Sequence, residues 1–436
     1  MNIRTFLNTK ISSYLPNKEL LKSSFTYIGS DVLNKILPFL LLPIITRYLS
    51  PEDYGTISVF TSIVGFLAVF VGLGSQELVQ ANFFKETKET LKYHIGDVFI
   101  ITLITSVIYL LGFIIFGDYF FKEYGLGLIW LILAVLYTFG EFFGKIISII
   151  WIAEGRSTTF AKYQNFGSLF IIATTILFVV ALELGWRGRL YSLLLSSFVF
   201  STITFYLLNT EGYIGLRLNF EKLKICVNDS MGVLPYSVSF WFKNAALLLL
   251  MAATIGKSET GIYTVAMGIA GLIIFATNSL NKVWQPLLYK MLANKNVIDT
   301  KIVKSMYIFM VLIVSGGLFL IVISDLLVKT VLAPEFHSAT KYVRLLVISM
   351  TLQSLFTVMA DYLIFYKEGK KLTFASISGI VMQYLLIFMF YYLKNLTVSN
   401  IITALIITNL YTLIISWVMV HKVRSLPWLF FLKKKS

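Results

Sequence analysis

The chain has 436 residues and a formal net charge of +15; 57% of its residues are apolar and 14% are charged. A mean hydropathy of +0.81 excludes an ordinary water-soluble domain, which would expose a large apolar surface at this composition. The composition therefore predicts an all-α polytopic membrane protein.

Twelve apolar spans follow one another along the chain, each long enough to cross about 30 Å of hydrocarbon as a helix. They cover residues 24–48, 55–76, 98–116, 125–150, 166–182, 190–208, 230–255, 262–281, 305–324, 340–366, 372–393 and 395–420. The segments between them are too short for a domain with its own core. Any chemistry or binding is therefore expected inside the helical bundle.

Both ends of the chain are predicted to lie on the membrane surface. Residues 1–23 carry an apolar residue at every fourth position between basic residues, which predicts a short interfacial helix. Residues 422–436 form a basic, aromatic tail. Between these ends the sequence predicts a first six-helix bundle over 24–208, a cytoplasmic linker over 209–229 and a second six-helix bundle over 230–421.

The charge distribution predicts the orientation in the membrane. Most of the 37 lysines and arginines fall in the termini and in the even-numbered loops, which places those segments and both termini in the cytoplasm. The positive charge is thus a topology signal, and no nucleic-acid partner is expected. Cys226 is the single cysteine, so no disulfide can form within the chain, and we expect neither a metal nor another cofactor.

Ionisable residues interrupt only the first, fourth, seventh and tenth spans. A charge at the bilayer centre costs about 2.5 to 3.5 kcal/mol even on a mild insertion scale, so such residues are candidates for function. They are Asp31, Lys35, Glu141, Lys145, Lys243 and Asp361; Arg344 lies one turn from the outer end of its span and is expected to reach the membrane interface instead. The first four form two pairs spaced four residues apart, and each pair could instead neutralise itself on one helix face. The alternative for Lys243 is an ion pair with Asp31 or Glu141.

A shift of 206 residues superimposes parts of the two halves. Gly55 then falls on Gly261, and Ser58 falls on Thr264, each at the start of a charge-free span. The first and seventh spans, and the fourth and tenth, also become equivalent. An even number of helices in each half predicts parallel repeats, as in transporters that rock two bundles about a central site.

The start of each half resembles a known family. The run from Leu49 to Gly55 follows a proline-broken first span, Gly72–Leu73–Gly74 comes before Phe83 and Phe84, and 256–263 repeats the outer-loop pattern. These features resemble the polysaccharide flippases, the O-antigen and capsule branch of the multidrug/oligosaccharidyl-lipid/polysaccharide exporter superfamily. The resemblance implies two six-helix bundles forming a V in the bacterial inner membrane. It also implies alternating-access movement of an undecaprenyl-pyrophosphate-linked oligosaccharide from the cytoplasmic to the periplasmic leaflet.

Candidate residues follow from the charges and this implied cargo. Cationic Lys243, Lys35 and Lys145 are the expected substrate-binding residues, because a pyrophosphate or an acidic sugar supplies the anion that a buried lysine needs. Trp241 and Asn244 lie beside Lys243 on the same span. The expected carriers of a coupling proton or sodium ion are Asp31, Glu141 and Asp361. The expected partners are the lipid-linked glycan, the lipid bilayer and a polysaccharide polymerase.

Two other functions compete with the flippase. A cation-coupled drug exporter of the same fold would be expected to have a cavity with mostly acidic residues, whereas the intramembrane charges here are mostly those of lysines. A membrane-embedded O-antigen polymerase or ligase, an enzyme, would carry a long periplasmic loop, and no outer segment here is longer than 325–339. The sequence also lacks a phosphate-binding loop of the G-x-x-x-x-G-K-[ST] type, so nucleotide-driven transport is not expected.

The orientation can be tested with reporter fusions. A reporter fused after Ser436 should be active only in the cytoplasm, and one inserted at Lys257 only on the outer side, because basic loops stay inside. An outward C-terminus would mean an odd number of spans and would contradict the two-bundle architecture.

Overall fold

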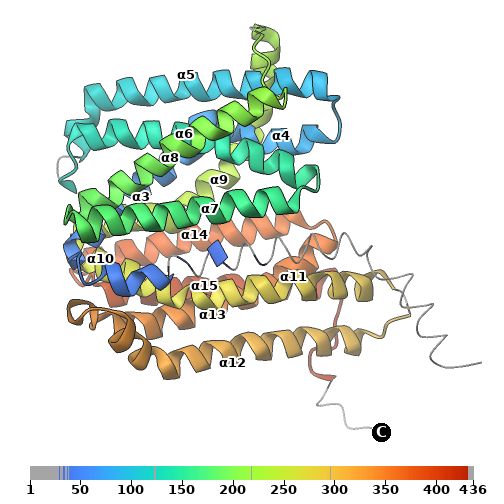
Figure 1. The fold of residues 1–436 in the computed structure, drawn as a ribbon. Coiled ribbons are helices and arrows are strands. Elements are labelled where there is room, and N and C mark those ends of the chain that lie inside the picture. The colour runs from blue at the N-terminus through green and yellow to red at the C-terminus, as the bar shows by residue number, and fades with distance from the viewer. Residues whose placement is uncertain are drawn as a thin grey trace, which may run out of the picture. The chain divides into compact units, whose positions relative to one another are not determined.

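The computed structural model describes residues 29, 33, 34, 37, 39–121, 124–217, 219–294 and 296–430. These residues form helices and connecting turns, with no β-strand among them. The long helices are α3 (Pro51–Phe70), α5 (Lys88–Phe121), α6 (Leu128–Ala153), α7 (Ser157–Thr175), α8 (Gly185–Thr210), α9 (Phe220–Thr254), α10 (Lys257–Ala270), α11 (Leu272–Ala293), α12 (Asp299–Val331), α13 (Ala339–Phe365), α14 (Gly369–Tyr392) and α15 (Val398–Val423). Figure 1 shows these helices in the colours of the chain order.

Eleven helical stretches of the described residues are long and apolar enough to span a membrane. They coincide with the second to twelfth predicted spans, and α10 and α11 together form the eighth. The first predicted span lies largely outside the described residues, as do the predicted interfacial helix over 1–23 and the last residues of the tail. The all-helical, multi-pass architecture is therefore confirmed.

The described chain forms two compact units. Unit 1 contains the described residues of Met1–Leu41, Phe66–Phe120 and Gly127–Ser237, and unit 2 contains those of Leu42–Gly65, Phe121–Leu126 and Val238–Ser436. Helices α3 and α9 each contribute to both units, because the division falls within them. The division into bundles at 24–208 and 230–421 stays a prediction.

Helix α3 ends at a short glycine turn. Gly72, Leu73 and Gly74 all have positive φ, with values of 79°, 54° and 75°, a conformation that glycine adopts without steric cost. The turn redirects the chain from α3 into α4 (Ser75–Phe83). The hydroxyl of Thr105 on α5 accepts a hydrogen bond from the Gly72 amide at 3.0 Å. The Gly72–Leu73–Gly74 motif is therefore a kink between α3 and α4 that is anchored to α5.

An ion-pair cluster joins the turns at one end of unit 1. Arg156 lies in the turn between α6 and α7 and pairs with Glu154 at 3.0 Å and with Glu211, at the end of α8, at 2.8 Å. The hydroxyl of Tyr213 donates to Glu154 at 2.5 Å. These contacts fix the end of α8 to the α6–α7 turn, in the region predicted to face the cytoplasm.

In unit 2, the first turns of α3 and α10 touch through bare backbone. A Cβ atom added at Gly55 would lie 2.0 Å from the Lys257 carbonyl oxygen, and one added at Gly261 would lie 1.9 Å from the Pro51 carbonyl oxygen. Positions 55 and 261, and positions 51 and 257, are the equivalent pairs of the 206-residue repeat. The contact is therefore reciprocal, as expected for two repeats that meet about an approximate two-fold axis.

Side chains next to the glycines continue this contact. The Ser58 and Thr264 hydroxyls, which are also equivalent in the repeat, lie 2.8 Å apart. One turn further along α3, the Ser62 carbonyl accepts a hydrogen bond from the indole of Trp241 on α9 at 3.1 Å. Close approach at small residues is how helices associate inside a membrane, where the hydrophobic effect does not favour association.

The glycine contact can be tested by adding one methyl group. Gly261→Ala should lower the free energy of unfolding by about 1–3 kcal/mol or more, because the new Cβ clashes with a rigid backbone carbonyl. Gly268→Ala on the same helix is the matched control, since its nearest neighbouring atom, Leu42 Cδ1, lies at 3.9 Å. Thermal unfolding of the purified proteins in detergent measures both. Equal melting temperatures for the two variants would contradict the close approach.

Candidate functional site

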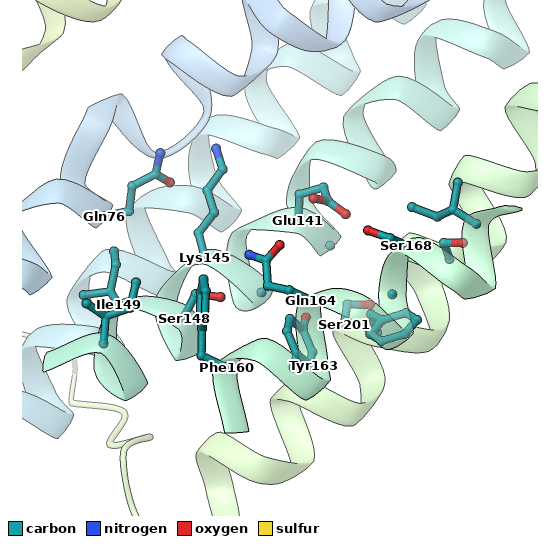
Figure 2. Close-up of a pocket in the computed structure, with 17 residues that line it drawn as sticks. Gln76, Glu141, Lys145, Ser148, Ile149, Phe160, Tyr163, Gln164, Ser168 and Ser201 are labelled. Carbon is teal, nitrogen blue, oxygen red and sulfur yellow. The ribbon is translucent and has the colours of Figure 1, made fainter. Parts of the chain in front are cut away.

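A polar pocket lies within unit 1, inside the apolar helices. Its volume is about 460 Å³, and its walls come from α6, α7 and α8, with Gln76 of α4 on one side. Its polar lining consists of Gln76, Glu141, Lys145, Ser148, Tyr163, Gln164, Ser168, Ser196 and Ser201. Figure 2 shows Glu141, Lys145 and Ser148 coming from one helix, and Tyr163, Gln164 and Ser168 from the next.

Glycines on α6 bring the walls of the pocket together. A Cβ at Gly140 would lie 2.5 Å from the Ser197 hydroxyl oxygen of α8, and one at Gly144 would lie 2.9 Å from the Tyr163 hydroxyl oxygen of α7. Glu141 and Lys145 each directly follow one of these glycines. The four-residue spacing thus gives α6 a face of small residues for packing and an adjacent charged edge for the pocket.

Hydrogen bonds hold the polar wall of α7 in place. The Tyr163 and Thr204 hydroxyls lie 3.0 Å apart. Asn34 donates to Asn165 at 3.3 Å and accepts a hydrogen bond from Ser168. The Ser196 hydroxyl is buried and has no hydrogen-bond partner among the described residues. The pocket therefore offers hydroxyl, amide and ionisable groups. Burying such groups in a membrane costs free energy unless they bind a partner, which suggests that they bind water or a ligand.

Two predicted site residues, Asp31 and Lys35, lie outside the described residues. Glu141 and Lys145 line the pocket together. Lys243, Trp241, Asn244 and Asp361 belong to unit 2. The structure therefore brings the fourth-span pair into one cavity, whereas Lys243 and Asp361 lie at two other places in unit 2.

Lys243 lies in the membrane-spanning part of α9, and its turn is tied to α14. Gln383 donates to the Lys243 carbonyl at 3.3 Å, and the Tyr384 hydroxyl donates to the Phe242 carbonyl at 2.6 Å. The Lys243 side chain is half-buried, and no carboxylate in the described part of unit 2 pairs with its ammonium. Asn244 follows it and is half-buried, and Trp241 packs against α3 through its bond to Ser62.

Asp361 is a carboxylate buried between α11 and α13, with only 3% of its surface exposed. Its Oδ1 accepts a hydrogen bond from Gln285 at 2.6 Å, while its Oδ2 has no hydrogen-bond partner among the described residues. Asn281, one turn before Gln285 on α11, also faces this carboxyl group. Two amides but no paired cation surround the acid in the described part of the chain, which suits a group that takes up a proton or a small cation.

Sequence reasoning missed most of the pocket. Gln164 and Ser168 are four residues apart on α7, and Ser196 and Ser201 share the facing side of α8. Polar residues recurring at helical spacing within an apolar span are a usable signal for a lined cavity. The amides of Asn281 and Gln285 show the same spacing on α11.

Solved structures with this fold are transporters. An inward-facing multidrug resistance MATE family transporter of the MOP superfamily aligns with a TM-score of 0.68 at 19% sequence identity, covering 90% of this chain and 94% of that chain. An outward-facing conformation of a MATE family transporter aligns with a TM-score of 0.59 at 18% identity, covering 94% and 96%. The chain is therefore a multi-pass membrane protein with the fold of these transporter structures.

The family is given by the sequence. The profile of the family described as "Polysaccharide biosynthesis protein" matches residues 44–341, which is more than half of the chain. The chain belongs to this polysaccharide biosynthesis family, which confirms the resemblance found in its motifs. A protein of the Lsg locus of Haemophilus influenzae is 22% identical over 375 residues, covering 83% of this chain and 89% of the relative. An uncharacterized membrane protein of the same organism is 20% identical over 370 residues, covering 82% and 87%.

Water access to the pocket is testable with single cysteines. Cys226 is buried, and burial raises the pKa of its thiol to about 11, so the background reactivity is low and Cys226→Ser removes it. In that background, Ser148→Cys should react with a membrane-impermeant maleimide in inside-out vesicles, because thiolates form in water. Leu136→Cys on the same helix is 53% exposed but lies outside the pocket lining and should stay unlabelled in the bilayer. Equal labelling of the two positions would contradict an aqueous pocket.

Proposed function

We propose that the protein is a flippase. It moves an undecaprenyl-pyrophosphate-linked oligosaccharide, an O-antigen or capsule repeat unit, from the cytoplasmic to the periplasmic leaflet of the bacterial inner membrane. It works by alternating access, with both termini in the cytoplasm, and it carries out no covalent step of its own. Family membership and the transporter fold support this proposal.

The observation that carries the proposal is the hydroxyl- and amide-lined pocket of unit 1. Sugar hydroxyls both donate and accept hydrogen bonds, and Gln76, Gln164 and Ser168 supply donors and acceptors that match them. Polar side chains that line a pocket inside a membrane protein do not stabilise it unless water or a polar cargo fills the pocket. A cargo that is half glycan and half lipid would keep its sugars in this pocket and its polyprenyl chain in the bilayer.

Lys243 supplies the proposed contact with the anionic part of the cargo. No carboxylate in the described part of unit 2 neutralises it, and a diphosphate or an acidic sugar would do so. Lys35 and Lys145 are the other proposed cationic contacts. The α14 hydrogen bonds to the carbonyls of 242 and 243 would hold the lysine at a fixed depth.

A strain that lacks its own flippase tests both the function and Lys243. The wild-type chain should restore polysaccharide export. Lys243→Ala should lower export roughly tenfold or more at normal protein abundance, because a hydrogen bond to a charged group contributes about 1.5–3 kcal/mol. Lys243→Arg should keep part of the activity, since the charge survives while the geometry changes.

Two results would count against this assignment. If the wild-type chain fails to restore export although it is inserted, the flippase proposal is wrong for this glycan pathway. If Lys243→Ala instead lowers protein abundance, and removal of a partner carboxylate restores it, the lysine serves as half of a structural ion pair.

Transport is proposed to be coupled to an ion gradient, with Asp361, Glu141 or Asp31 carrying the proton or sodium ion. Asp361 is the best supported of these, since its buried carboxyl group faces amides and one of its oxygens lacks a partner among the described residues. A buried carboxylate without a paired cation favours uptake of a proton or a cation.

Coupling can be measured in vesicles with proton and sodium gradients dissipated separately. Collapsing the coupling gradient should stop transport by the wild type, and Asp361→Asn should lose the response to that gradient. Asp325→Asn is the matched control, because Asp325 is an exposed acid paired with Lys329 at 2.7 Å. Undiminished transport with both gradients collapsed would contradict ion coupling and would indicate passive transport.

A further inference from the structure

An apolar groove runs between α11 and α12 in unit 2, and its lining includes neither Lys243 nor Asp361. Its volume is about 590 Å³. Its floor is the stacked pair Trp284 and Phe309, whose ring centroids lie 4.5 Å apart with an interplanar angle of 13°. Leu287 of α11 and Ile308 of α12 form parts of its rims, and both are more than half exposed. Because its rims are exposed apolar side chains on helices of membrane-spanning length, we expect the groove to open toward the lipid chains.

Two lysines close the end of the groove at the start of α12. Lys301 and Lys304 border the groove, and both also border a neighbouring hollow of about 720 Å³. Asn296, Thr300 and Phe430 contribute to the hollow. The lysines therefore stand between an apolar groove on one side and a more polar hollow on the other.

Both lysines lack a counterion in the described part of the chain. The nearby acid at the start of α12, Asp299, pairs with Arg424 at 2.5 Å. No other carboxylate of the described residues pairs with Lys301 or Lys304, and both side chains are exposed. By the predicted topology they lie at the cytoplasmic headgroup level, where a basic pair attracts phosphate groups.

We propose that this surface docks the lipid-linked cargo before transport, with the polyprenyl chain in the α11–α12 groove, the diphosphate at Lys301 and Lys304, and the first sugar in the adjoining hollow. The proposal rests on the proposed flippase function. It adds a second cargo contact in the cytoplasmic leaflet, outside the polar pocket.

The order of the three surfaces favours this occupant over an ordinary phospholipid. An apolar groove, a pair of cations and a polar hollow follow one another in the same order as chain, diphosphate and glycan in the cargo. A diphosphate also offers more charge to two unpaired lysines than a phosphodiester does.

The test uses a polyprenyl diphosphate that carries a photoreactive group on its chain, with the full-length protein in nanodiscs. After illumination, peptides of α11 and α12 should carry the label. Lys301→Glu/Lys304→Glu should reduce that labelling at least about tenfold, because two attractive charges become repulsive. Lys367→Glu/Lys370→Glu, with the same spacing and the same predicted membrane side, should leave it unchanged.

The groove is tested separately from the charges. Leu287→Trp should fill it and reduce labelling, whereas Leu318→Trp, at an exposed position of α12 outside the groove, should not. Excess phosphatidylglycerol in the nanodisc, or inorganic pyrophosphate in solution, should compete poorly, because neither combines a single long chain with a diphosphate.

Several outcomes overturn the docking proposal: labelling confined to other helices, equal labelling of the Lys301/Lys304 and Lys367/Lys370 variants, or full competition by phosphatidylglycerol, which would identify a general anionic-lipid site. Export by the wild-type chain in the flippase-deficient strain is measured in parallel. Intact export with an unlabelled groove rejects this inference alone, whereas loss of both export and labelling rejects the flippase function as well.

Discussion

The contact between α3 and α10 depends on two glycines that leave no room for any other side chain. Gly55 and Gly261 each face the carbonyl side of the other helix's first turn, so the two backbones meet directly. The Ser58–Thr264 contact requires this spacing, and Trp241 of α9 packs against the next turn of α3 through its bond to Ser62. Such a contact is short-ranged and involves no interlocking large side chains. Two repeats joined in this way can form a tight seal and still separate, as the proposed alternating access would require.

The polar groups of the membrane-spanning helices form three separate sites, and each site has a different chemistry. The pocket of unit 1 gathers hydroxyls, amides and the Glu141 and Lys145 side chains, which suits glycan binding. Asp361 is enclosed with amides, which suits uptake of a small cation or a proton. Lys243 lacks a carboxylate partner in the described part of unit 2, which suits an anionic cargo. These separate chemistries match the separate tasks of the proposed ion-coupled flippase, whose proposed cargo is part sugar, part phosphate and part lipid.

The sequence predicted the helices well, because hydrocarbon thickness and hydropathy set the length of each span independently of the tertiary structure. It also predicted that positions 55 and 261 are equivalent, but not that they touch, since equivalence in a repeat does not specify an interface. The sequence also identified Glu141 and Lys145 in the fourth span, because placing a charge inside the bilayer costs free energy. The other pocket residues are uncharged serines, glutamines and a tyrosine. Burying such a residue costs little free energy, so these residues are common in any membrane helix and do not mark a site. Only the packing of α6 against α7 and α8 through Gly140 and Gly144 shows that their polar faces converge.

The proposed opening of the α3–α10 contact during transport is tested most directly by locking that contact. In a Cys226→Ser background, Ser58→Cys and Thr264→Cys replace two hydroxyls that lie 2.8 Å apart, within reach of a disulfide. Cargo translocation is then measured in vesicles before oxidation, after oxidation and after reduction. The account predicts normal translocation for the reduced protein, arrest on oxidation and recovery on reduction, with each single-cysteine variant insensitive to the oxidant. Undiminished translocation by a fully cross-linked protein would show that the contact never opens and would contradict the account.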